Sequence, residues 1–228
     1  MDVKRETRDI LLYTMPFATW IALQTALPAT AWAYAVRAAA TTVVGLLCWQ
    51  LQRVRRPLPQ CATGKMHVVP IGILFGVLVT VLWIVPEVSD VYRTWFCWPI
   101  GSLPTPSSEP SPYDPAVCGW ALTIAKLIGS AFVIAPVEEV FFRSFLYRWL
   151  QQRDFLAVPL SRFDLSAFLW MVFLFTLEHD RPLAAAMAGA LYGFTAIRFG
   201  LVSAIMAHVT TNLLLALHVI FSGAWAFW

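Results

Sequence analysis

Long apolar runs separated by short polar segments constrain this chain more than any other feature of its sequence. A helix needs about 20 apolar residues to cross the hydrocarbon core of a bilayer, and most of the runs reach or approach that length. The runs occupy residues 10–27, 31–51, 67–86, 119–147, 165–179, 183–197 and 200–221. Composition agrees, because 59% of the residues are hydrophobic and 13% are charged, whereas soluble domains have roughly 25% charged residues. A soluble enzyme and a disordered chain are therefore excluded.

We expect an all-α fold, a polytopic membrane helical bundle of about seven transmembrane helices, with six or eight as the neighbouring counts. No repeat of fixed period and no low-complexity linker divides the chain, so residues 1–228 are interpreted as a single integral-membrane domain. The net charge is only +3, and no basic stripe with interleaved aromatic residues indicates a nucleic-acid partner. The expected surroundings are the lipid bilayer.

Two polar segments differ in charge and thereby predict the orientation. The loop 53–65 has four basic residues and no acidic one, whereas the proline-rich segment 87–118 has four acidic residues and one arginine. Cytoplasmic loops of membrane proteins are enriched in Lys and Arg. We therefore expect the N-terminus and loop 53–65 in the cytoplasm and segment 87–118 outside. Cys97 and Cys118 share that outer segment, and an oxidising compartment would allow a disulfide between them.

The run 119–147 contains two adjacent acids, Glu138 and Glu139, followed by Arg143. Each ionisable side chain inside a bilayer costs on the order of 2.5–3.5 kcal/mol on insertion scales. Glu139 and Arg143 are four residues apart with the acid first, which is the favourable order for a helical ion pair. Glu138 lies about 100° around the helix from Glu139, so Arg143 cannot serve both carboxylates equally. The alternative interpretation is a helix end at the interface, where the charged pair reaches water.

Two further runs contain polar residues at helical spacing. Phe175 and His179 are four residues apart at the end of one run, and His208 and Asn212 are four apart inside another. The first spacing lets the phenyl ring pack against the imidazole, although a histidine at a span end also fits an ordinary interfacial position. The second pair would equally fit hydrogen bonding between helices. Lys126 is the main other charged residue within a run, and we expect its side chain to extend toward the interface.

The segments EEVFFR, FTLEH and HVTTN fit the patterns EExxxR, FxxxH and HxxxN, in that order along the chain. In these motifs, residues 119–221 resemble the CPBP family of intramembrane proteases, also called the ABI family, which includes the type II CAAX prenyl endopeptidases. Within that family the chain also resembles the CAAX-protease-related proteins found beside exosortase sorting systems. The first hundred residues carry no such resemblance.

The resemblance implies a glutamic-type intramembrane peptidase that hydrolyses a peptide bond of a membrane-associated protein or peptide, without an essential metal or other cofactor. The implied catalytic residues are Glu138, His179, His208 and Asn212. Glu138 and His179 would activate the attacking water, and the other two would hold the oxyanion. The implied supporting residues are Glu139, Arg143 and Phe175. The resemblance also implies a bacterial inner-membrane location and an exosortase-type sorting system as a partner; it predicts no oligomeric state.

Three alternatives stay open at the level of sequence. A zinc site could use His179, His208 and Glu138 as ligands, although no HExxH motif is present. Intramembrane Glu and His residues also suit a transporter or proton relay, but no inverted halves are visible. A catalytically idle scaffold or immunity factor of the same fold is the third. The sequence does not decide which membrane face the site opens to.

Overall fold

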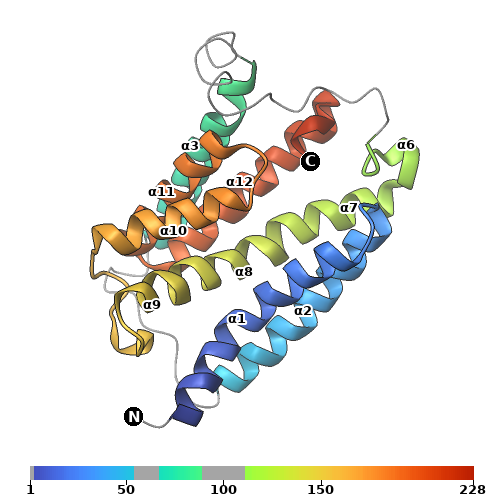
Figure 1. Ribbon diagram of the computed structural model, residues 1–228. Coiled ribbons are helices and arrows are strands. Elements are labelled where there is room, and N and C mark those ends of the chain that lie inside the picture. The colour runs from blue at the N-terminus through green and yellow to red at the C-terminus, as the bar shows by residue number, and fades with distance from the viewer. Residues whose placement is uncertain (1–2, 54–66, 89–110) are drawn as a thin grey trace.

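The computed structural model describes residues 3–53, 67–88 and 111–228, and this part of the chain is helical without a strand (Figure 1). The predictions for residues 54–65 and for most of segment 87–118 fall on residues outside these ranges. Of the two cysteines in the predicted disulfide, Cys97 also lies outside them, whereas Cys118 is described and carries a free thiol. The α-helices are α1 (Val3–Ala26), α2 (Ala31–Arg53), α3 (Val68–Val88), α6 (Pro115–Cys118), α7 (Trp120–Ile128), α8 (Ala135–Glu139), α9 (Tyr147–Gln151), α10 (Leu165–Leu177), α11 (Pro182–Phe199) and α12 (Leu201–Ser222).

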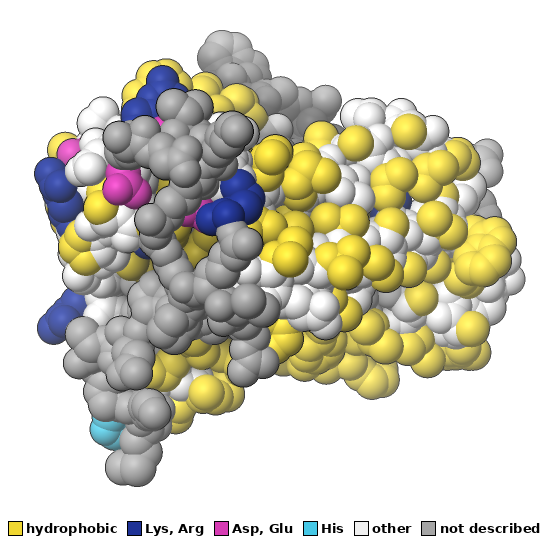
Figure 2. All heavy atoms as spheres, turned by 90° about the horizontal axis from the view of Figure 1, so that it is seen from below, with side chains coloured by type: hydrophobic (Ala, Val, Ile, Leu, Met, Phe, Trp, Pro, Cys, Tyr) yellow, Lys and Arg dark blue, Asp and Glu magenta, His cyan; other side chains and the backbone are white. Residues whose placement is uncertain are grey.

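Each predicted apolar run coincides with a helix, and the expected helical membrane bundle is confirmed. Among the described residues, four helical segments are long and apolar enough to cross a membrane: Ala31–Gln52, Val68–Val85, Trp120–Gln151 and Leu201–Ser222. The apolar helix α10 is shorter, and the count of seven crossings stays a prediction. Figure 2 shows hydrophobic side chains spread widely over the visible face, with charged ones gathered toward one end. Such a surface suits contact with lipid rather than water.

The helix Trp120–Gln151 runs through the middle of the bundle (Figure 1). It packs against α1 and α2 on one side and against α10 and α12 on the other. Helices α3, α11 and α12 pack against one another, and α10 packs against α11. The three motifs are therefore carried by the central helix, by the end of α10 and by α12, which all meet inside the bundle.

Two glycines allow α3 and α12 to approach closely. A Cβ atom on Gly72 would lie 2.6 Å from the Met206 Cβ, and one on Gly76 would lie 2.5 Å from the Thr210 Cβ. Thr211 Oγ1 donates a hydrogen bond to the Gly76 carbonyl oxygen over 3.0 Å. Small residues at a membrane helix interface permit this kind of backbone contact. The interface fixes the position of α12, which carries two of the candidate catalytic residues.

The central helix is interrupted by two π-helical segments, η1 (Gly129–Ile134) and η2 (Val140–Leu146). In η1, the Ala135 N–H donates to the Ser130 carbonyl oxygen, five residues earlier rather than four. Pro136 follows directly and has no N–H to donate, which disfavours a regular α-helix at this point. The short α-helical stretch between the two segments carries Glu138 and Glu139. π-helical turns occur frequently at functional sites. The apolar run 119–147 predicts one continuous helix, so these turns were not expected.

Candidate active site

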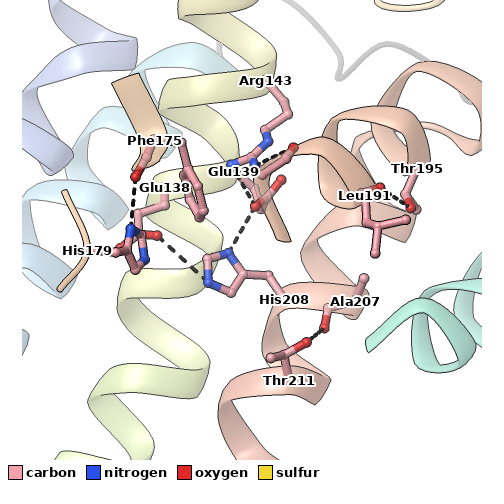
Figure 3. Close-up of polar contacts among 11 residues, drawn as sticks. Glu138, Glu139, Arg143, Phe175, His179, Leu191, Thr195, Ala207, His208 and Thr211 are labelled. Carbon is pink, nitrogen blue, oxygen red and sulfur yellow. Dashed lines mark hydrogen bonds and ion pairs between the residues drawn. The ribbon is translucent and has the colours of Figure 1, made fainter. Parts of the chain in front are cut away.

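Glu139 is fully buried and has two positively polarised neighbours (Figure 3). Its Oε1 atom lies 3.0 Å from Arg143 Nη1 and 2.9 Å from His208 Nδ1. Arg143 also donates from Nη2 to the Gly189 carbonyl oxygen over 3.2 Å, and its guanidinium carbon lies 4.4 Å from the Phe175 ring centroid. The ion pair expected from the four-residue spacing is present. The further bonds of the two residues, from Arg143 to Gly189 and from His208 to Glu139, link the central helix to α11 and α12.

Glu138 has a different environment from its neighbour. Its Oε2 atom lies 3.8 Å from His208 Nε2 and, within the described part of the chain, has no hydrogen-bond partner although it is buried. Arg143 makes its ion pair with Glu139, in agreement with the angular separation of the two acids around the helix. Each carboxylate keeps one buried oxygen without a hydrogen bond in the described part of the chain, but only Glu139 is paired with an arginine.

His179 lies in the turn that follows α10, and its ring is oriented by its own helix. Nδ1 lies 2.9 Å from the Phe175 carbonyl oxygen. Because a carbonyl oxygen only accepts, Nδ1 is assigned the proton and Nε2 is left with a lone pair. The rings of Phe175 and His179 have centroids 4.5 Å apart, which is the packing predicted from their spacing. The turn therefore presents a basic nitrogen rather than a second donor.

The shortness of α10 explains how His179 reaches the other motifs. A helix of 13 residues is only about 20 Å long, whereas the hydrocarbon core is about 30 Å thick. The turn after Leu177 therefore ends at the depth of the bundle interior instead of at its outer surface. From the sequence alone, His179 lies at the outer end of the short run 165–179. That position would put it at a different depth in the membrane from the other two motifs.

His208 is held between two partners on different helices. Its Nδ1 atom donates to Glu139, and its ring stacks on Tyr192 of α11, with centroids 4.6 Å apart and an angle of 21° between the planes. The Phe175 ring centroid lies 6.1 Å from the imidazole on another side. The ring is thus fixed in orientation, and its second nitrogen, Nε2, is directed toward Glu138 (Figure 3).

Asn212 connects α12 to the π-helical segment η1. Its Nδ2 donates to the Ser130 carbonyl oxygen over 2.9 Å, the same oxygen that accepts from the Ala135 N–H. One hydrogen of the amide is used in this bond and orients the group. The other hydrogen and the amide oxygen are available to a neighbouring group.

All four candidate catalytic residues line one partly open cavity of about 210 Å³. The wall also contains residues that the sequence analysis did not assign to a site: Trp83, Ser130, Tyr192, Thr211, Phe227 and Trp228. Tyr192 is a polar aromatic residue in a helix rich in Ala and Gly, and this was the one signal in the sequence that could have pointed to it. The others are ordinary residues of apolar segments, and only the packing of the helices makes them part of the wall.

Lys126 lines the same cavity. We had expected its side chain to extend toward the interface, but its Nζ atom lies 4.1 Å from the Tyr34 ring centroid and 4.6 Å from that of Tyr113. The difference arises because α2 and the segment before α7 supply aromatic rings within reach of the ammonium group, and such rings attract a cation.

The alternative zinc site receives no support from the geometry. Among the residues that the structure describes, no group of three or more His, Cys, Asp or Glu side chains is arranged so that it could hold a metal ion. Oε1 of Glu139 is already engaged by Arg143 and His208. The donor atoms that converge on the cavity are arranged instead as one free carboxylate oxygen, two imidazole nitrogens and a carboxamide.

Comparison with known proteins gives one match. No curated protein and no solved structure matches the chain. Residues 120–214 match the family model described as "Type II CAAX prenyl endopeptidase Rce1-like", and this range contains every residue of the three motifs. Residues 120–214 therefore resemble an Rce1-like type II CAAX prenyl endopeptidase domain, which is consistent with a membrane protease of the CPBP family.

Proposed function

We propose that the protein is a glutamic intramembrane peptidase that hydrolyses a peptide bond of a membrane-associated protein or peptide. One observation carries the proposal: the free oxygen of Glu138 faces a cavity shared with His179, His208 and Asn212, while the adjacent Glu139 is engaged by an ion pair. A chain that needed only structural ion pairs would have no use for the second, unpaired carboxylate, because burying it costs free energy.

Glu138 acts as the general base in this mechanism. A water molecule in the cavity gives one proton to the Glu138 carboxylate while its oxygen attacks the carbonyl carbon of the substrate. The lone pair on His179 Nε2 accepts the second hydrogen of the water and orients it. When the C–N bond breaks, the proton passes from Glu138 to the departing nitrogen. The products are a carboxylic acid and an amine, Glu138 returns to its initial state, and in water the acid gives its proton to the amine so that a carboxylate and an ammonium group result.

Asn212 and His208 stabilise the negative charge that develops on the carbonyl oxygen. Asn212 offers its second amide hydrogen, since the first is bonded to Ser130. His208 donates from Nδ1 to Glu139, so its Nε2 carries a proton only when the ring is an imidazolium. The Glu139 carboxylate attracts that charged form, whereas burial of the ring opposes it. Each donor to the oxyanion is expected to contribute about 10²–10³-fold to kcat.

The cavity points toward the end of the bundle where α3 ends and α7 begins, because Trp83, Lys126 and Phe227 lie in its wall. With the N-terminus in the cytoplasm, as the basic loop predicts, this end faces outward, and a bacterial inner membrane would give it access to exported proteins. An exosortase-type sorting system stays the predicted partner. Labelling by an impermeant thiol reagent tests the orientation: Cys61, which lies outside the described residues, should react only in opened cells.

Peptide cleavage by the purified protein tests the proposed activity. The wild type and Glu138→Ala are incubated in detergent with a peptide library, each with and without a chelator. We expect cleavage by the wild type alone, unaffected by the chelator. Equal cleavage by both proteins would refute the mechanism, and loss with the chelator would favour the zinc alternative. Proton or solute flux in vesicles without any cleavage would favour a transporter.

A further inference from the structure

A buried arginine and a half-buried lysine share a group of aromatic rings beside the candidate active site. Lys126 of α7 places its Nζ atom over the rings of Tyr34 and Tyr113, at 4.1 and 4.6 Å from their centroids. The guanidinium carbon of Arg37, on α2, lies 4.9 Å from the Trp20 ring centroid and 5.3 Å from that of Tyr34. Arg37 and Tyr34 are almost fully buried. The rings stabilise the two charges but do not neutralise them.

No acidic side chain neutralises this pair in the described part of the chain. Across residues 6–52, 67–85 and 111–228, the ion pairs join Arg8 to Asp9 and Arg143 to Glu139, and His208 lies beside Glu138 and Glu139 as a partner that is charged only when its ring is protonated. Neither Lys126 nor Arg37 takes part in them. Charged residues inside a membrane protein usually pair or line a pathway. Two adjacent like charges in an apolar setting therefore leave room for an anion that comes from outside the chain.

Lys126 is placed to meet such an anion inside the candidate active-site cavity. It lines the cavity together with Glu138 and Asn212, and Ser130, one turn further along the same helix, holds the Asn212 side chain. Twelve residues separate Lys126 from Glu138, which is at most about 18 Å along a helix. Three helical turns therefore separate Lys126 from Glu138, and Lys126 meets a substrate at the other end of the same cavity.

We propose that Lys126 binds a carboxylate group of the substrate at this end of the cavity, and that Arg37 strengthens the positive field behind it. This inference rests on the proposed peptidase function, which supplies a peptide as the ligand. A peptide offers a carboxylate at its C-terminus or on an Asp or Glu side chain. An ammonium group flanked by aromatic faces can donate hydrogen bonds to either. Lys126 is therefore a specificity-determining residue rather than a catalytic one.

The test compares peptide substrates and protein variants in pairs. One peptide is offered with a free C-terminus and as its amide, each with and without an acidic side chain on the same side of the cleaved bond. For the wild type, removing the carboxylate that is recognised should raise KM about tenfold to hundredfold, as expected for loss of a hydrogen bond to a charged group. The carboxylate whose removal has this effect identifies its source. kcat should change little.

Lys126→Met keeps the apolar stem and removes the charge, so the KM ratio between the amide and the acid should fall close to one. Lys126→Arg should keep most of the ratio. Arg153→Met is the matched control, because Arg153 also lies over an aromatic ring, that of Trp149 at 4.5 Å, but is exposed and away from the cavity. It should leave the ratio unchanged. A ratio that is the same in the wild type and in Lys126→Met would overturn the inference while leaving the peptidase intact.

Binding separates this inference from the proposed function. The same peptides are titrated against the Glu138→Gln protein and against Glu138→Gln with Lys126→Met, with the fluorescence of the cavity tryptophans Trp83 and Trp228 as the signal. Carboxylate-dependent binding that disappears with Lys126 supports the site even if no peptide is cleaved, in which case only the peptidase proposal fails. If the binding affinity is the same with and without the carboxylate, and with and without Lys126, the inference is wrong.

Discussion

Glu138 and Glu139 are neighbours in the chain, yet they belong to two different regions of the molecule. Glu139 faces the closed interior, where Arg143 and His208 engage one oxygen of its carboxylate. Glu138 lines the cavity and has no arginine partner, although each of the two acids keeps one buried oxygen without a hydrogen bond in the described structure. In the proposed mechanism, Glu139 therefore holds helices in position and Glu138 is the reactive base. Residue type alone does not decide the role of a buried acid; the neighbours around the helix decide it.

The largest expected effect on stability follows from removing the charge of Glu139. Glu139→Gln leaves Arg143 buried without its counterion, and breaking a buried pair costs about 3–5 kcal/mol. Thermal unfolding in detergent should show this loss. Making Arg143 neutral as well should recover part of the stability and activity, because the two sites are coupled and their effects do not add. If the stability losses of the two single variants simply add in the double variant, the buried ion pair does not stabilise the protein.

Asn212→Ala tests the cavity side of the comparison. Loss of an oxyanion donor should lower kcat by about 10²–10³-fold while KM changes little. The Asn212 bond to Ser130 also joins two helices, so the melting temperature is measured on the same preparation. A protein that loses stability but keeps its full specific activity would show that Asn212 serves only to hold the helices together.

A smaller effect is expected where α3 meets α12. Gly76→Ala would force a methyl group to within 2.6 Å of the Ala207 carbonyl oxygen, and such overpacking typically costs about 1–3 kcal/mol. Gly45→Ala in α2 is the matched control, because no atom lies within 4 Å of the added carbon, and it should be neutral or slightly stabilising. If both substitutions have the same effect, the close approach of the two helices does not fix α12.

The sequence predicted those features of this site that depend on neighbours along the chain. Glu139 and Arg143, and likewise Phe175 and His179, meet because residues four apart share a helical face. The long apolar runs likewise predicted the helices, since each must satisfy its own backbone in lipid. The three motifs, in their order along the chain, predicted the resemblance that the match over residues 120–214 supports.

Contacts between distant segments could not be predicted in this way. The bond from Asn212 to Ser130 joins residues 82 positions apart, and the stacking of Tyr192 on His208 depends on how α11 packs against α12. No local pattern encodes either contact. The π-helical segments around Glu138 were not predicted either, although Pro136 is a local signal that disfavours a regular α-helix there. Lys126 was noted as a charged residue within an apolar run and was expected to reach the interface, because its ring partners lie on other segments.

The most direct test of the different roles of the two acids is to measure turnover and thermal unfolding on the same preparations of Glu138→Gln and Glu139→Gln. Both substitutions keep the shape of the side chain and remove one charge. Glu138→Gln should abolish peptide cleavage, because an amide cannot take a proton from water, and should unfold near the wild-type temperature. Glu139→Gln should be the less stable protein and retain measurable cleavage. A stable but inactive Glu139→Gln together with an unstable Glu138→Gln would contradict the assignment of the two roles.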